Sequence, residues 1–191
     1  MTSPNALSAS ARPSAGPAIG PSFSLVPFDP TNAPDVDRLH ASVFGPGRFA
    51  RTAFRLREQA EPIASFCFTA MDRDNLIGAV TVSRIRVGAD RGVLLGPLAV
   101  VPSQRERGVG RALLAKAVER AFLSGEPFVL LVGDKPYYEP FGFTPCAADQ
   151  IVMPGPVAPD RLLVARGPLC ADDMPKGVAR GERQTRLPRR T

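Results

Sequence analysis

The stretch GVLLGPLAVVPSQRERGVGRALL, residues 92–114, decides the fold of this chain. An apolar run of strand length ends at Val101 and Pro102, a polar turn rich in Arg and Gly follows, and an amphipathic helix begins near Gly108. The first amides of a helix have no partner within it and lie at the positive end of its dipole, and glycine lets a ligand approach them. The stretch therefore predicts a strand, an anion-binding loop and a helix, with a ligand that carries phosphates.

The spacing within this loop excludes two common nucleotide-binding motifs. The P-loop pattern G-x-x-x-x-G-K-[ST] is absent, and Leu113 stands where a dinucleotide fingerprint requires its third glycine. What remains is a turn with Gly108 and Gly110 whose successive amides can wrap a diphosphate, while Arg105 and Arg111 offer charge-assisted contacts. Taken alone, the glycines could also serve only to start the helix.

The rest of the chain alternates strand and helix patterns around this unit. Strand-like runs are predicted at residues 23–28, 63–72, 76–87, 92–100, 128–132 and 161–165, and helical patterns at 35–44, 51–59, 108–124 and 136–141. A strand, a helix and a second strand in succession imply a parallel crossover, here attached to an antiparallel meander. The predicted class is a three-layer α+β fold with one mixed, mostly antiparallel central sheet.

Composition favours one domain in a reducing compartment. A chain of 191 residues with 44% apolar residues suits a single core. The isolated cysteines Cys67, Cys146 and Cys170 suggest neither a disulfide framework nor a metal site. No apolar run approaches the roughly 20 residues of a membrane helix, and no signal pattern opens the chain, so a soluble cytoplasmic protein without membrane contact is expected.

The net charge of +6 lies at the two ends of the chain. Residues 176–191 carry six Lys or Arg and one Glu, and residues 1–22 contribute only Arg12. Short basic ends are usually solvated, so nucleic acid is disfavoured as a partner. We expect a flexible arm at 1–22, a folded domain at 23–170 and a basic flexible tail at 171–191.

Three ordered segments resemble the GNAT superfamily of N-acetyltransferases. Its acetyl-CoA loop reads Arg or Gln, two residues, Gly, one residue, then Gly or Ala, and Arg105, Gly108 and Gly110 occupy those positions. The segments LGPLAV before the loop and VGDKPYYEPFGF after the helix, residues 95–100 and 132–143, are similar to the YhbS-like branch. The resemblance covers about residues 55–145 and implies the GNAT fold, with acetyl-CoA as co-substrate and no metal.

The resemblance also implies a geometry for the site. In GNAT proteins the strands that match 92–100 and 128–132 splay apart and hold the pantetheine arm, and Pro97, which lacks an N–H, fits a local bulge there. An N–H of the first strand is expected to polarise the thioester carbonyl. The implied cofactor-binding residues are Leu98, Ala99, Val100, Arg105, Glu106, Arg107, Gly108, Val109, Gly110 and Arg111.

The resemblance assigns the acid that protonates the departing thiolate to Tyr138, which stands in the family's Y-x-x-x-G-F spacing. Tyr137 is the competing residue, and both could instead pack a short helix on the sheet. The base stays open, because some GNAT members carry a Glu on the strand that here reads VLLG, residues 93–96. Glu58, Glu61 and Asp134 are water-mediated substitutes, and the single histidine, His40, is expected to be structural.

The resemblance thus predicts acetyl transfer to a primary amine by direct attack. A cysteine-linked route is disfavoured because no activating partner accompanies Cys67 or Cys146 in the sequence. The acceptor pocket is expected between the helical segment before Ile63 and the region after Phe143, with residues 161–165 closing one side. A non-catalytic acyl-CoA sensor remains the alternative, and formation of a homodimer stays open.

Overall fold

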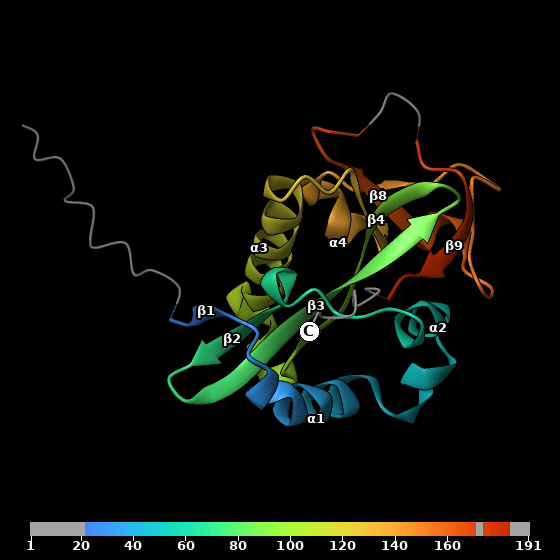
Figure 1. Cartoon of the computed structure of the whole chain (residues 1–191). Coiled ribbons are helices and arrows are strands. Elements are labelled where there is room, and N and C mark those ends of the chain that lie inside the picture. The colour runs from blue at the N-terminus through green and yellow to red at the C-terminus, as the bar shows by residue number, and fades with distance from the viewer. Residues whose placement is uncertain (1–21, 171–173, 184–191) are drawn as a thin grey trace, which may run out of the picture.

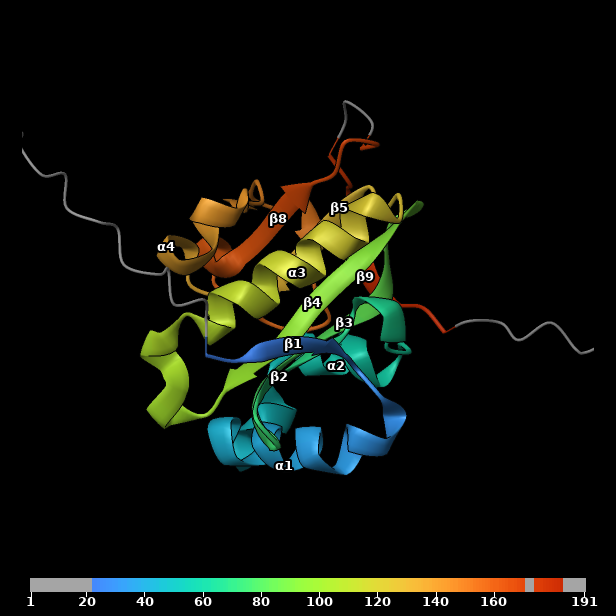
Figure 2. The ribbon, with the colours of Figure 1, turned by 90° about the vertical axis from the view of Figure 1, so that its left-hand side faces the viewer.

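A twisted sheet crosses the molecule, and helices cover both of its faces (Figure 1). The structure is a computed structural model that describes residues 22–170 and 174–183. Helix α3 (Val109–Leu123) lies across one face, as Figure 2 shows, while α1 (Ala33–Phe44) and α2 (Thr52–Glu58) lie on the other. The short helix α4 (Lys135–Tyr138) follows the central strands. The predicted three-layer arrangement is confirmed.

The described strands form one mixed sheet in the order β1-β2-β3-β4-β5-β8-β6, with β9 on a free stretch of β3 and β7 beside β9. Neighbours are antiparallel except for the pairs β4–β5 and β7–β9. The parallel pair β4–β5 is joined through α3, as the sequence predicted. The strands are β1 Ser24–Pro27, β2 Phe68–Asp72, β3 Asn75–Val87, β4 Asp90–Val100, β5 Phe128–Val132, β6 Thr144–Pro145, β7 Ile151–Val152, β8 Leu162–Arg166 and β9 Gly177–Gly181.

A bulge in β4 changes which side chains face each layer. Val93 and Leu95 pack in the same cluster as α3, and so do Leu98 and Val100, so the alternation slips by one residue between 95 and 98. The register agrees, because Leu95 pairs with Val82 and Leu98 with Val80, leaving one extra residue on β4. The extra backbone falls at Gly96 and Pro97, which confirms the bulge expected from Pro97.

The parallel pair separates soon after it forms. The β4–β5 register contains only Val93 opposite Val129 and Leu94 opposite Leu130, although both strands continue beyond these residues. From Leu95 onward β4 is therefore paired with β3 on one edge and has no partner in β5 on the other. This is the predicted splay.

Two predicted elements differ from the observed ones. The run 63–72 forms a strand only from Phe68, because a 3-10 helix occupies Ala64–Phe66. The predicted flexible tail is wrong for residues 174–183, which lie in the described structure and contain β9. The five residues of β9 contain little sequence pattern that predicts a strand. They form one because they pair with Ile85–Val87 at the edge of β3. The predicted arm at 1–21 and residues 184–191 lie outside the described residues.

Candidate active site

The loop before α3 ends at a glycine that the backbone requires. A 3-10 helix, Pro102–Arg107, leads into Gly108, which adopts a left-handed conformation with φ of 78° and has open space where a Cβ would stand. No side chain caps α3, and its first interior hydrogen bond runs from the Ala112 N–H to the Gly108 carbonyl at 3.0 Å. The amides of the first turn therefore carry the positive end of a 15-residue helix without a side-chain acceptor.

The charged residues of this loop fall into two groups. Arg107 is engaged within the protein, because its guanidinium forms an ion pair with Asp72 at 2.7 Å and also bonds the side chain of Gln104. These contacts fasten the loop to the end of β2. Arg105 and Glu106 are exposed, and Arg111 lies on the first turn of α3 with its guanidinium 5.5 Å from the centroid of the Phe141 ring.

A cavity of about 1250 Å³ opens where β4 and β5 separate. The β4 bulge from Leu95 to Leu98 forms part of its wall, and Val132 and Gly133 at the end of β5 face it from the other side. Of the predicted strand contacts, Leu98 lines the cavity, whereas the side chains of Ala99 and Val100 are buried in the two opposite layers. Only backbone atoms of the latter two can reach a ligand, as can those of Val109, whose side chain is fully buried.

The two neighbouring tyrosines of α4 point to different places. A Cβ placed on Gly110 would stand 2.5 Å from the Tyr137 hydroxyl oxygen, so this hydroxyl lies against the first turn of α3. A Cβ placed on Gly133 would stand 2.1 Å from the Tyr138 ring, which is half-buried on the end of β5 and packs edge-on against Phe143. Both tyrosines line the cavity, but the Tyr137 hydroxyl lies beside the loop before α3.

Burial raises the pKa of both phenols. The pKa of Tyr138 rises to about 12, mainly through desolvation and further through Tyr137 and Asp134. The pKa of Tyr137 is also raised by burial, while the cation of Arg111 acts in the opposite direction. Both hydroxyls are therefore protonated donors near neutral pH.

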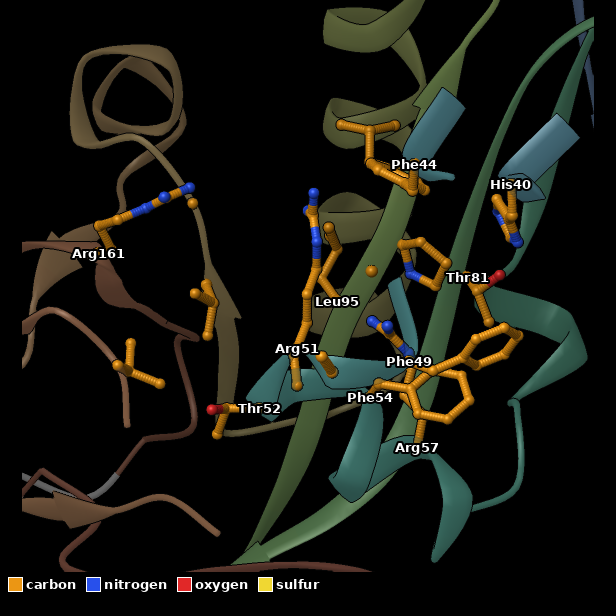
Figure 3. Close-up of a pocket in the computed structure, with 18 of the residues that line it drawn as sticks. His40, Phe44, Phe49, Arg51, Thr52, Phe54, Arg57, Thr81, Leu95 and Arg161 are labelled. Carbon is orange, nitrogen blue, oxygen red and sulfur yellow. The ribbon is translucent and has the colours of Figure 1, made fainter. Parts of the chain in front are cut away.

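The end of the cavity beside α1 and α2 is the end at which the sequence predicted an acceptor pocket, without naming most of its residues. Asp134 is the one predicted base substitute that lines the cavity, where it forms an ion pair with Arg161 at 3.3 Å, while Glu58 and Glu61 do not contribute to the lining. His40 also lines it, from α1. Figure 3 shows the labelled side chains around this end. They are His40, Phe44, Phe49, Arg51, Thr52, Phe54, Arg57, Thr81, Leu95 and Arg161.

Sequence reasoning missed Arg51 and Arg57 as cavity residues. The segment RTAFRLRE, residues 51–58, contains three arginines, and only the tertiary structure shows that the first and third face the cavity while Arg55 bonds the Pro154 carbonyl at 3.0 Å. Leu56, which is fully buried, could have pointed to Arg57. The residue that follows a buried position on a helix lies at the margin of the buried face.

The described part of the chain gives two further results. It contains no helix long and apolar enough to cross a membrane. Within residues 22–170 and 174–183, no group of three or more His, Cys, Asp or Glu is arranged to hold a metal ion.

Two solved structures of GNAT proteins are similar to this arrangement. One similar solved structure is the GNAT family N-acetyltransferase YhbS of Escherichia coli, in complex with CoA, at 25% identity and a TM-score of 0.70, covering 84% of this chain and 89% of that one. A Brucella melitensis GNAT acetyltransferase in complex with acetyl-CoA, at 20% identity and TM-score 0.54 over 74% of this chain and 94% of that one, shares the fold.

Sequence comparison agrees with the structural likeness. The uncharacterized N-acetyltransferase YjhQ of Escherichia coli K12 is 27% identical over 132 residues, which cover 67% of this chain and 73% of YjhQ. The model of the acetyltransferase (GNAT) family matches residues 34–143, more than half of the chain. The chain therefore belongs to the GNAT acetyltransferase family.

Proposed function

We propose that this protein is an acetyl-CoA-dependent N-acetyltransferase that transfers the acetyl group to a primary amine by direct attack. One observation carries the proposal. The gap between β4 and β5 beyond Leu94 opens into a cavity that runs from the helical layer of α1 and α2 to the tyrosines of α4. A long, narrow acyl donor and a separate acceptor can meet in such a space.

The loop before α3 fits the diphosphate of CoA. Gly108 supplies the left-handed turn and the open space, and the uncapped first turn of α3 supplies amide donors. Arg105 and Arg111 add positive charge at the surface, whereas the Arg107 side chain holds the loop in place through Asp72. We assign Glu106, Val109 and Gly110 backbone roles in this cradle, and Leu98, Ala99 and Val100 backbone contacts along β4.

We assign the acid role to Tyr138. Its ring is fixed between Gly133 and Phe143 at the point where the two strands separate, and its phenol keeps its proton at neutral pH. A phenol with a pKa of about 12 is a weaker acid than a free thiol, whose pKa is near 8.5. Tyr138 therefore acts mainly by donating a hydrogen bond to sulfur as negative charge develops there.

Direct attack is favoured over a cysteine-linked intermediate. Cys67 lines the cavity, but burial raises the pKa of its thiol to about 11. The Val82 N–H donates to its sulfur at 3.2 Å, which holds Cys67 against β3. A buried thiol without a thiolate-stabilising cation is a poor nucleophile.

The test is a turnover assay that follows CoA release with amines, polyamines, amino acids and peptides as acceptors. The proposal expects sustained turnover with at least one primary amine, and mass spectrometry should find acetyl on its nitrogen. Tight CoA binding together with no turnover for any acceptor would instead favour an acyl-CoA sensor.

A further inference from the structure

The acceptor end of the cavity contains a cation that no residue of the described part of the chain neutralises. Arg57 is half-buried on α2, and in the described part of the chain no carboxylate lies within ion-pair distance of its guanidinium. Its described neighbours are the Phe54 ring, whose centroid is 5.8 Å from Cζ, and the like charge of Arg51. A partly desolvated charge without a counterion is costly unless a ligand supplies one.

The cation stays charged in this position. Burial and the charge of Arg51 lower the pKa of Arg57 to about 10, which still leaves the guanidinium protonated near neutral pH. Asp37 and Asp134 also line the cavity, and Asp134 is engaged by Arg161 at 3.3 Å. The region around Arg57 therefore favours an anion.

Arg57 also lies close to the backbone at which we expect the reaction. Its Nη1 is 3.6 Å from the position that a Cβ on Gly96 would occupy, at the β4 bulge. A carboxylate bound to this nitrogen would stand about 3 Å from it. The anion would thus lie only a few bonds from an amine that attacks at the bulge, as in an amino acid.

The surface beside this cation is aromatic. Phe44, Phe49 and Phe54 line the same end of the cavity, with the Phe49 and Phe54 rings edge-to-face at 5.0 Å between centroids. The Arg51 guanidinium lies 5.1 Å from the Phe44 centroid and adds positive charge to the cavity lining. These rings suit an apolar side chain.

We propose that the acceptor is an amino acid with an apolar side chain, whose free carboxylate binds the Arg57 guanidinium and so places the amine at the β4 bulge. This inference rests on the proposed acetyltransferase function and gives it a substrate class. Arg57 is then a specificity-determining residue that recognises a carboxylate by charge and geometry together.

The test compares acceptors that differ only in the carboxylate, phenylalanine against phenethylamine, and leucine against isopentylamine. The full-length protein should prefer the amino acids in kcat/KM. Arg57→Met should raise KM for the amino acids about 10- to 100-fold, leave the decarboxylated amines nearly unchanged and so remove the preference. Arg57→Lys, which keeps the charge but not the planar fork, should retain part of it.

Arg38→Met is the matched control, because it removes an exposed arginine of α1 that pairs with Asp35 and does not line this cavity. It should leave all four acceptors unaffected. Equal loss of kcat for both members of a pair in Arg57→Met would overturn the inference, since it would mean that Arg57 polarises the thioester. A full-length protein that turns over phenethylamine as well as phenylalanine would overturn it too.

Calorimetric titration of phenylalanine in the presence of CoA separates this inference from the proposed function. If no amine is acetylated, the proposed function fails, yet binding that disappears in Arg57→Met would still support the carboxylate site. Absence of phenylalanine binding to the unmodified protein would overturn the carboxylate site. Circular dichroism of each variant confirms that a loss of binding does not come from unfolding.

Discussion

At the residue scale, the two tyrosines of α4 show how adjacent side chains come to lie against different elements. Tyr137 reaches the first turn of α3 because Gly110 has no Cβ, and Tyr138 packs on Gly133 at the end of β5. The family spacing pointed to Tyr138, but spacing alone cannot tell where either hydroxyl lies. The fold places one phenol near the loop before α3 and the other at the end of β5.

Replacing Tyr138 by Phe should lower kcat by about 100-fold, because the sulfur would lose its hydrogen-bond donor in the transition state. Tyr137→Phe is the matched comparison and should act mainly on KM for acetyl-CoA, since this hydroxyl lies beside the loop. Steady-state kinetics on both variants measures the difference. A Tyr138→Phe protein with unchanged kcat for every accepted amine would remove the acid assignment.

The raised pKa of Tyr138 predicts a pH profile. A donor acts in its protonated form, so a pKa raised from 10.0 to about 12 moves the loss of activity to higher pH. At pH 10 about 1% of such a phenol is ionised, against about half for an unperturbed one. With phenethylamine, which has no carboxylate for Arg57 to bind, we expect kcat to show no decline between pH 9 and 10 from ionisation of this phenol. A decline centred near pH 10 that Tyr138→Phe abolishes would contradict this.

At the element scale, the tyrosines of α4 pack against two glycines, Gly110 and Gly133. The two positions differ in how well they would accommodate a larger side chain. At Gly133 an added methyl would meet the fixed ring of Tyr138 at 2.1 Å, while at Gly110 it would meet only the mobile end of Tyr137 at 2.5 Å. The contact of α4 with the end of β5 is therefore rigid, whereas its contact with α3 can adjust.

Gly133→Ala should displace α4 and lower both kcat and the stability of the fold by about 1 to 3 kcal/mol, the cost of overpacking a close contact. Gly110→Ala should be nearly neutral for stability, since alanine favours the helix. Thermal unfolding and turnover of the two proteins provide the comparison. Similar behaviour of both variants would mean that the contact of α4 with β5 is not rigid.

At the scale of the whole molecule, the last described strand supports the side of the cavity that α2 forms. β9 pairs with Ile85–Val87 of β3, and Gly181 packs so closely on α2 that a Cβ there would stand 2.4 Å from the Leu56 carbonyl oxygen. Because α2 carries Arg57, a segment first interpreted as a tail helps to position the cavity wall.

A protein that ends at residue 173 should therefore be less stable than one that ends at residue 183. Removing β9 leaves the edge of β3 unpaired and uncovers the packed surface of Leu56, so we expect Tm to fall by about 5 to 15 °C and aggregation to increase. Differential scanning calorimetry on the two shortened proteins makes the comparison. Equal Tm values would show that β9 adds nothing to the fold.

The sequence by itself determined the parts of this protein that depend on local order along the chain. The pattern of residues 92–114 predicted β4, the loop and α3, and Pro97 predicted the bulge, because a missing N–H and a left-handed glycine act at their own positions. The assignment of Tyr138, by contrast, came from the resemblance of residues 132–143 to the GNAT family.

Only the tertiary structure decided which distant side chains share the cavity. Arg57 on α2, Asp134 after β5 and Arg161 before β8 lie far apart along the chain and line one space only because the sheet brings their elements together. The order of β9 likewise depends on a partner strand about 90 residues away in sequence. The local sequence pattern is enough to predict a single helix or strand. Which side chains are buried, which strands pair and which charges share a cavity depend on contacts between residues that are distant in the sequence.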